Sequence, residues 1–250
     1  MKLPYDVLNI IFDRSGFIPQ IRFRQISELT YELEMTDFSN SAITLKLTDT
    51  ILKNYVKITK LNVQYCYHVT NVNHLHELRE LHAPGLCTIN QYGISQLRHL
   101  RKLDADNNFR ITNVHHLHEL QELHASELCG ICQYGISQLR HLRKLDENNN
   151  PRITNVNHLR ELQELNASFE CGIDQSGISR LQHLRKLNAN FNSRITNVNH
   201  LRELRELNAF DKCGIDQNGI SELHHLCKLD AYFNKRITTR SFAPQRLSVD

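Results

Sequence analysis

The 42 residues from Ile153 to Arg194, ITNVNHLRELQELNASFECGIDQSGISRLQHLRKLNANFNSR, decide the fold of this chain. The same unit is repeated four times, beginning at Val69, Ile111, Ile153 and Ile195, and a fifth copy stops after Thr238. Each copy is itself a doublet, because Leu165 and Leu187 occupy the same position in its two halves. A unit this short cannot bury its apolar face alone, so neighbouring units must stack on one another. The sequence therefore predicts an elongated solenoid.

The leucine spacing resembles that of leucine-rich repeats, which recur every 20 to 29 residues. Leu61 to Asn71, LNVQYCYHVTN, is similar to the cysteine-containing class of these repeats. The resemblance implies an α/β fold, in which a curved parallel β-sheet lines the concave side and short helices the convex side of about nine or ten rungs. Each rung supplies a short strand such as 164–167, whose Leu165 and Ala167 point inward because side chains alternate along a strand.

Two further columns are expected to hold the rungs together. Inward alanines recur at Ala83, Ala105, Ala125, Ala167, Ala189, Ala209 and Ala231. Glu147 interrupts this column, either by turning to solvent or as a local weakness. On alternate rungs, Asn108, Asn150, Asn192 and Asn234 form an asparagine ladder whose amides bond the turn backbone.

The N-terminal 36 residues lie outside the repeat pattern. Val7, Leu8, Ile11 and Phe12 follow Leu3-Pro4 at helical spacing, and a second apolar segment begins near Pro19. LPYDVLNIIF at 3–12 and IRFRQIS at 21–27 resemble the F-box, although the Trp that often follows its second helix is absent. The resemblance implies that Leu3, Pro4, Leu8, Ile11 and Phe12 contact the adaptor protein of a cullin-type ubiquitin ligase. The alternative is a helical cap that only seals the first repeat.

These patterns divide the chain into four parts: 1–36, the F-box-like segment; 37–68, a cap and first rungs; 69–236, the repeat solenoid; and 237–250, a C-terminal cap or tail. Within the second part, 43–47 alternates like a strand and 51–58 is expected to be a helical return. The resemblance implies a substrate-recognition subunit of the ligase, with an unidentified target protein on the concave face. A stand-alone interaction scaffold remains the alternative.

The candidate target-binding residues lie in two outward columns of the strands. The first contains His82, Asp104, His124, Asp146, Asn166, Asn188, Asn208 and Asp230. The second ends in Phe210 and Tyr232, which are expected to be exposed anchors, after Pro84, Asp106, Ser126, Asn148, Ser168 and Asn190. Concave solenoid surfaces serve as extended binding faces, and exposed aromatic side chains are typical anchors there.

Two other columns alternate in charge and are assigned to stability. Lysine and glutamate alternate just before the inward leucine, so neighbouring strands neutralise each other, whereas a functional strip would keep one sign. Glutamate and histidine alternate at Glu77, His99, Glu119, His141, Glu161, His183, Glu203 and His225. If these are paired, thermal stability is expected to be higher at pH 6 than at pH 8.

Bulk composition excludes several classes of function. A net charge of +3 on interleaved acids and bases predicts binding to neither nucleic acid nor membrane, and no segment resembles a signal peptide or membrane span. Equivalent cysteines two rungs apart are too far apart to bridge, so the seven cysteines predict reduced thiols and a cytoplasmic or nuclear protein. No distinct nucleophile or convergent metal ligands appear, so we expect neither enzymatic activity nor a cofactor.

Overall fold

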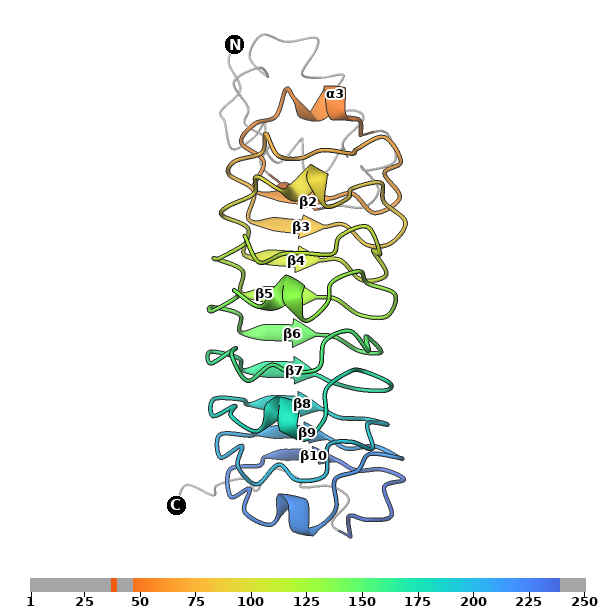
Figure 1. The fold of residues 1–250 in the computed structure, drawn as a ribbon, viewed down its shortest axis with the longest axis vertical. Coiled ribbons are helices and arrows are strands. Elements are labelled where there is room, and N and C mark those ends of the chain that lie inside the picture. The colour runs from red at the N-terminus through yellow and green to blue at the C-terminus, as the bar shows by residue number, and fades with distance from the viewer. Residues whose placement is uncertain (1–36, 40–46, 239–250) are drawn as a thin grey trace, which may run out of the picture.

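A computed structural model describes residues 37–39 and 47–238. The described residues form a parallel sheet of ten short strands in sequence order, each paired with the next. The strands are β1 Asp37–Phe38, β2 Lys60–Asn62, β3 Glu80–His82, β4 Lys102–Asp104, β5 Glu122–His124, β6 Lys144–Asp146, β7 Glu164–Asn166, β8 Lys186–Asn188, β9 Glu206–Asn208 and β10 Lys228–Asp230. Figure 1 shows them stacked along the long axis of the molecule. The predicted leucine-rich-repeat solenoid is confirmed for this part of the chain.

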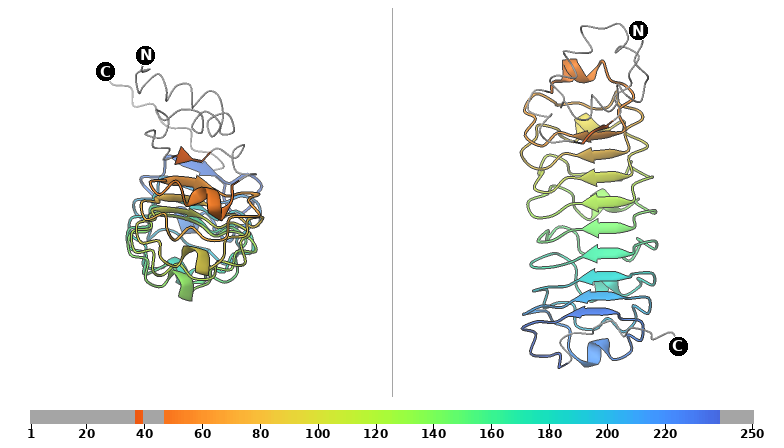
Figure 2. Two further views of the ribbon diagram at one scale, coloured as in Figure 1. Left: turned by 90° about the horizontal axis from the view of Figure 1, so that it is seen from above. Right: turned by 180° about the vertical axis from the view of Figure 1, so that it is seen from behind.

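The sheet and the helical turns lie on opposite sides of the solenoid. Figure 2 shows, from above, that the end rungs are displaced toward the sheet side relative to the middle rungs, so the sheet occupies the inner side of a gentle curve. Side chains alternate as expected: in β7, Leu165 is buried, whereas Glu164 and Asn166 are partly exposed. The leucine, isoleucine and valine columns form one continuous core along the described rungs.

Helical turns occur on alternate rungs only, whereas the sequence predicted one on every rung. They are the 3₁₀ turns η3 Tyr92–Ile94, η4 Tyr134–Ile136, η5 Ser176–Ile178 and η6 Asn218–Ile220. Only the longer half of each repeat carries the Gly-Ile pair that these turns use. Gly177 has no alternative there, because a Cβ atom would lie 2.3 Å from the Thr154 carbonyl oxygen of the preceding rung. The extra two residues of the longer half form this close-packed turn.

The strand predicted at 43–47 lies almost wholly outside the described residues, whereas the helical return predicted at 51–58 is shorter and begins earlier. The first described strand is β1 at Asp37–Phe38, and residues 40–46 lie outside the described part. The helical return is the four-residue α3 Asp49–Leu52, capped by the Thr48 hydroxyl, which accepts a hydrogen bond from the Ile51 amide. The Asp49 carboxylate accepts hydrogen bonds from the Thr70 amide and hydroxyl, which joins this turn to the repeats.

The asparagine ladder is confirmed. The Asn192 amide donates to the carbonyl oxygens of Ala167 and Ile173 in the preceding rung, at 2.9 and 3.1 Å. Its side-chain oxygen accepts from the Arg194 amide, so one buried side chain satisfies three backbone groups. Asn108, Asn150 and Asn234 repeat these bonds.

A glutamine ladder on the longer half-repeats was not predicted. The Gln175 side-chain oxygen accepts from the amides of Thr196 and Asn197, and its amide donates to the Asn197 carbonyl. The other members, at equivalent positions, are Gln91, Gln133 and Gln217. The glutamine side chains therefore hydrogen-bond the backbone of the next rung at the surface, whereas the asparagine side chains hydrogen-bond backbone groups in the core.

Glu147 lies inside the alanine column and does not turn to solvent. Its side chain is fully buried, and neither carboxylate oxygen has a hydrogen-bond partner. Burial raises the pKa of Glu147 well above its ordinary value, and the neighbouring charge of Asp146 acts in the same direction. An unpaired buried carboxyl is costly, so Glu147 is a weak point in an otherwise regular core.

All seven cysteines are free thiols. The repeat column Cys87, Cys129, Cys171 and Cys213 is buried in the core. Burial raises the pKa of Cys87 to about 11 and that of Cys129 to about 12. These cysteines therefore pack as small apolar side chains.

No helix in residues 37–39 and 47–238 has the length and apolar character needed to cross a lipid bilayer.

Candidate protein-binding face

The N-terminal half of the first outward column is occupied by its own ion pairs. His82 Nδ1 lies 2.5 Å from Asp104 Oδ2 on the next strand. Burial alone raises the pKa of Asp104, but hydrogen bonds from His82 and the Asp106 amide outweigh it and hold the pKa below its ordinary value. These groups stabilise adjacent rungs and have little free hydrogen-bonding capacity for a ligand.

Glu122 is the centre of a second charged cluster on this face. Its Oε1 atom lies 2.6 Å from His124 Nε2, 3.1 Å from Lys102 Nζ and 3.0 Å from Lys144 Nζ. Burial raises the pKa of Glu122, but the three donors prevail and lower it to about 2. The cluster confirms that the lysine–glutamate column neutralises itself across strands. His124 therefore serves this cluster rather than an open surface.

Toward the C-terminus, the same column is less engaged. The Asn166 amide and the Ser126 hydroxyl both donate to Asp146 Oδ1 at 3.0 Å. Beyond them, the Asn208 side chain forms no hydrogen bond with the described part of the chain, and the Asn188 side-chain oxygen accepts only from the amide of Asn190. A shallow hollow of about 200 Å³ spans β6 to β9 over these residues. Free amide groups beside a hollow make this half the better surface for a partner.

Five aromatic side chains follow strands β7 to β10 and form what we call the aromatic cluster: Phe169, Phe191, Phe210, Tyr232 and Phe233. Their rings form a continuous chain. Phe169 stacks on Phe191 with centroids 4.8 Å apart, and Phe191 meets Phe210 at 5.4 Å. Phe210 then contacts Phe233 at 5.5 Å. Phe169, Tyr232 and Phe233 remain 48%, 56% and 63% exposed, so the cluster is an apolar surface at the sheet edge.

Three members of the cluster adopt left-handed backbone conformations. Phe169, Phe191 and Phe233 have φ values of 58°, 60° and 62°. The equivalent position is also left-handed in four earlier rungs, where Asn107 and Asn149 tolerate this conformation, whereas Tyr65 and Glu127 are less suited to it. A bulky residue costs of order 1 kcal/mol more there. Strain retained in exposed side chains is typical of functional surfaces.

The cluster corrects the prediction for the second outward column. Tyr232 is exposed as expected, but Phe210 is only partly exposed because Phe191 and Phe233 cover it. Ser126 and Ser168 are buried rather than outward. Phe169, Phe191 and Phe233 were not predicted because each lies one residue after the second outward column, where the left-handed conformation breaks the alternation of side chains. A comparison of that position across repeats would have found them.

The glutamate–histidine column is paired in one direction only. His99, His141 and His183 bind the glutamate 20 residues later, with distances of 2.7, 2.9 and 2.8 Å to Glu119, Glu161 and Glu203. Arg101, Arg143 and Arg185 contact the other oxygen of the same carboxylates. The column is therefore a series of separate exposed clusters, not a continuous ladder.

The proposed adaptor-binding residues Leu3, Pro4, Leu8, Ile11 and Phe12 lie outside the described residues. Within residues 37–39 and 47–238, no group of three or more His, Cys, Asp or Glu side chains converges to hold a metal ion.

No family model matches the sequence, and no curated protein matches it. Solved structures do. Internalin InlF of Listeria monocytogenes is similar over 90% of this chain and 71% of its own, with 17% identity and a TM-score of 0.65. Internalin C2 of the same organism covers 89% of this chain and 95% of its own, with 18% identity and a TM-score of 0.54. Rad7, solved in the yeast complex of Rad7 and Elc1, covers 92% and 81%, with 16% identity and a TM-score of 0.50.

These similarities and the sheet topology define the fold: a leucine-rich-repeat solenoid.

Proposed function

We propose that this protein is a recognition scaffold that holds a target protein against the C-terminal half of its sheet face. The observation that carries the proposal is the aromatic cluster. Exposed aromatic side chains bury large areas at low entropic cost, and they dominate binding energy at protein interfaces. Here they border free amide groups at Asn188 and Asn208, which supply the polar rim such interfaces require.

The N-terminal half of the face has a different role. The clusters around Asp104 and Glu122 satisfy their own charges, and displacing them would leave partly buried charges unpaired. We therefore assign His82, Asp104, His124 and Asp146 to stability and register. The proposed target-binding surface is therefore limited to the aromatic cluster and four polar residues: Asn166, Asn188, Asn208 and Asp230.

The target interaction is tested with variants that copy the chain's own earlier rungs. Phe169→Asn, Phe191→Asn and Phe233→Asn place at each position the residue found at Asn107 and Asn149, so the fold is retained. Proteins captured by the full chain are identified by mass spectrometry, and one purified candidate is measured by calorimetry. We expect the triple variant to weaken binding at least about 100-fold, as loss of hot-spot aromatics does.

The control removes exposed aromatics elsewhere. Tyr92 and Tyr134 are 82% and 68% exposed on the convex turns, where a later rung carries Ser176. Tyr92→Ser with Tyr134→Ser should leave binding unchanged. Equal losses in both variants, or none in the cluster variant, would refute the assignment of the target site.

The finer proposal is that the chain acts as the substrate-recognition subunit of a cullin-type ubiquitin ligase. It rests on the F-box-like segment at 1–36 in front of this repeat class. Rad7, which has a similar fold, was solved in complex with Elc1, so a solenoid of this kind accommodates a bound partner. In this role, Leu3, Pro4, Leu8, Ile11 and Phe12 contact the adaptor, and the ligase chemistry belongs to the partners.

Co-purification with the adaptor tests this second step independently. Leu8→Asp with Phe12→Asp should abolish adaptor binding and leave target binding intact. Normal adaptor binding by this variant contradicts the assignment. Failure of the intact chain to bind any adaptor, with the solenoid folded, favours a stand-alone scaffold whose N-terminal helices act only as a cap.

A further inference from the structure

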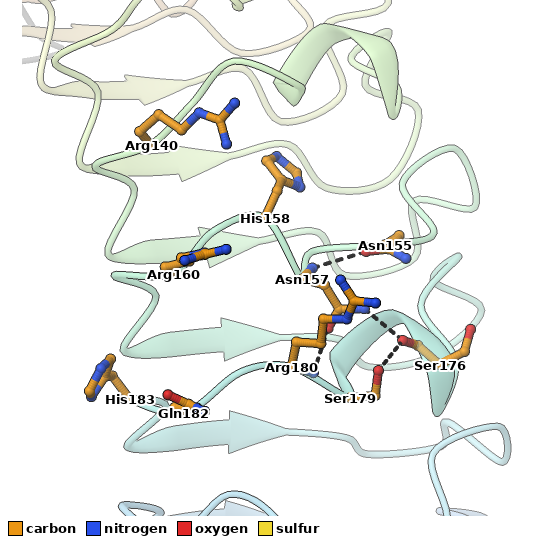
Figure 3. Close-up of a pocket in the computed structure, with 10 residues that line it drawn as sticks. All are labelled: Arg140, Asn155, Asn157, His158, Arg160, Ser176, Ser179, Arg180, Gln182 and His183. Carbon is orange, nitrogen blue, oxygen red and sulfur yellow. Dashed lines mark hydrogen bonds between the residues drawn. The ribbon is translucent and has the colours of Figure 1, made fainter.

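The convex side carries a groove with an unbalanced positive charge. The groove has a volume of about 1060 Å³ and includes Arg140, Arg160 and Arg180 together with His158 and His183. Its remaining lining residues are asparagine, serine and glutamine, and none is acidic. Figure 3 shows the three arginines on successive rungs beside η5, on the same stretch of surface. This surface lies away from the sheet face described above.

The arginines belong to a column that keeps one sign. The position five residues before the inward leucine is exposed throughout and reads, from the second to the seventh such rung, Arg98, His118, Arg140, Arg160, Gln182 and Arg202. Arg180 lies two residues before Gln182 on the same rung and supplies the missing charge. The position two residues before the inward leucine also carries arginine without acids, but Arg101, Arg143 and Arg185 in that column contact glutamates of a neighbouring column. A column of like charges without such partners adds nothing to stability, because like charges on adjacent rungs repel.

The guanidinium groups of this groove have no partner among residues 37–39 and 47–238. Arg140, Arg160 and Arg180 form no ion pair there, and only main-chain amides are bonded: Arg160 donates to the His158 carbonyl oxygen, and Arg180 donates to the Asn157 side-chain oxygen. The acids of the adjacent column do not compensate, because Glu161 is already held by His141 and Arg143. Glu203 is held in the same way by His183 and Arg185. Three free guanidinium groups therefore face one groove.

We infer that this groove is a second binding site, for an extended acidic segment of another protein that presents consecutive carboxylates. Arginine matches carboxylates through paired N–H donors, and neighbouring rungs are spaced by about 4.8 Å. Arg140 to Arg180 thus spans about 10 Å, or roughly three residues of extended peptide at 3.3 Å each. Gln182 also lines the groove, and its side-chain amide, which has no hydrogen-bond partner among the described residues, is available to the main chain of that peptide.

The lining favours a peptide over single-stranded nucleic acid. Sequence-tolerant nucleic-acid grooves combine positive charge with aromatic side chains on which bases stack. No aromatic ring other than histidine lines this groove. The exposed tyrosines of η3 and η4 are replaced by Ser176 in η5, which borders the groove.

The test is fluorescence anisotropy with the full chain and a labelled 12-residue peptide that contains four consecutive glutamates flanked by glycine and serine. Arg140→Gln, Arg160→Gln and Arg180→Gln together should weaken binding about tenfold, or roughly twofold per arginine. The matched control is Arg101→Gln, Arg143→Gln and Arg185→Gln, which removes the same charge from arginines that are already paired with glutamate. The control should change affinity less than twofold, and both variants should melt as the parent does.

Further arms distinguish other occupants. A scrambled peptide with separated glutamates should bind more weakly than the consecutive one. Tighter binding of a phosphoserine peptide, or of a single-stranded oligonucleotide of equal charge, would overturn the assignment to carboxylates. Absence of peptide binding at low salt, or equal losses in the two triple variants, would overturn the site itself. Loss of the aromatic cluster should not affect this binding, so the two proposed sites fail independently.

Discussion

Replacing Glu147 with alanine should stabilise this protein at neutral pH. Seven of the equivalent inward positions hold buried alanine, so the substitution restores the residue that the column already accommodates. The Glu147 carboxyl is fully buried without a hydrogen-bond partner, and burial raises its pKa well above its ordinary value. Each pH unit by which such a carboxyl is held neutral above its ordinary pKa costs about 1.36 kcal/mol. After the loss of buried methylene contacts, we expect a net gain of about 1–2 kcal/mol.

The sign of the pH dependence follows from the same shift. Between the ordinary pKa of Glu147 and its raised folded pKa, the folded state binds a proton that the unfolded state has released. The contribution of this carboxyl to stability is therefore fully present below about pH 4.5 and is lost as pH rises through that window, by at most about 1.4 kcal/mol per unit. Glu147→Ala removes this term, so its advantage over the parent should grow with pH.

The assay is thermal unfolding followed by circular dichroism from pH 4.5 to 8. A gain of 1–2 kcal/mol corresponds to a rise in Tm of about 2–8 °C for a domain of this size. Glu147→Gln separates charge from volume, because it flattens the pH profile while leaving a buried amide unsatisfied. Parallel profiles for parent and Glu147→Ala, or a lower Tm for the variant at pH 7, would refute the reasoning.

Three further predictions follow from other contacts. Glu122→Gln should lower Tm at pH 7, and the difference from the parent should disappear as pH falls from 4.5 toward 2. The reason is that the lowered pKa of Glu122 stabilises the fold above pH 4.5, and this stabilisation is lost as the carboxylate is protonated. A lower Tm of the variant that persists at pH 2 contradicts the prediction. Asn192→Ala should lower the free energy of unfolding, measured with urea, by about 2–3 kcal/mol, because two buried carbonyl groups and one amide lose their hydrogen-bond partner. A change below 0.5 kcal/mol would show that the asparagine ladder contributes little to stability. Exchanging His99 and His183 for alanine should raise the pKa of Glu119 and Glu203 toward the ordinary value, because the hydrogen bond of each imidazole is the main cause that holds the pKa of its carboxyl down. Carboxyl titrations followed by NMR that are the same in parent and variant contradict this prediction.

Spacing alone predicted the parts of the fold that depend on strict periodicity. Strand registers, the buried leucine and alanine columns and the asparagine ladder all follow from equal environments at equal intervals. The orientation of Glu147 did not, because a single substitution in a packed column is decided by competition between strain and desolvation. Helical turns on alternate rungs also escaped prediction, since they depend on two inserted residues and on the close approach of Gly177 to Thr154.

The binding surfaces were harder to predict than the fold. Reading residues as strict strand alternation placed Phe169 and Phe233 outside the outward columns, because a left-handed residue rotates the chain at that point. The arginine column was overlooked because opposite charges elsewhere on the chain give a small net charge. The local excess of positive charge is evident only in the structure, in which Arg140, Arg160 and Arg180 line the same groove.

The hydrogen-bonded residues of the ladder are separated by a constant number of residues in the sequence, and this separation limits how such a chain can change length. The ladder amides reach backbone groups 19 to 25 residues away, whichever copy they belong to. Removal of residues 111–152 would join Arg110 to Ile153 and delete Asn150 together with its own partners, while the bonds of Asn108 and Asn192 would remain. Across the junction, Gln91 would meet Thr154 and Asn155 in place of Thr112 and Asn113. Unequal recombination between copies can therefore shorten or lengthen the protein by whole repeats, and each product is a chain that can still fold. Such an event would carry the aromatic cluster nearer to or farther from the N-terminal segment in steps of two rungs, or roughly 10 Å.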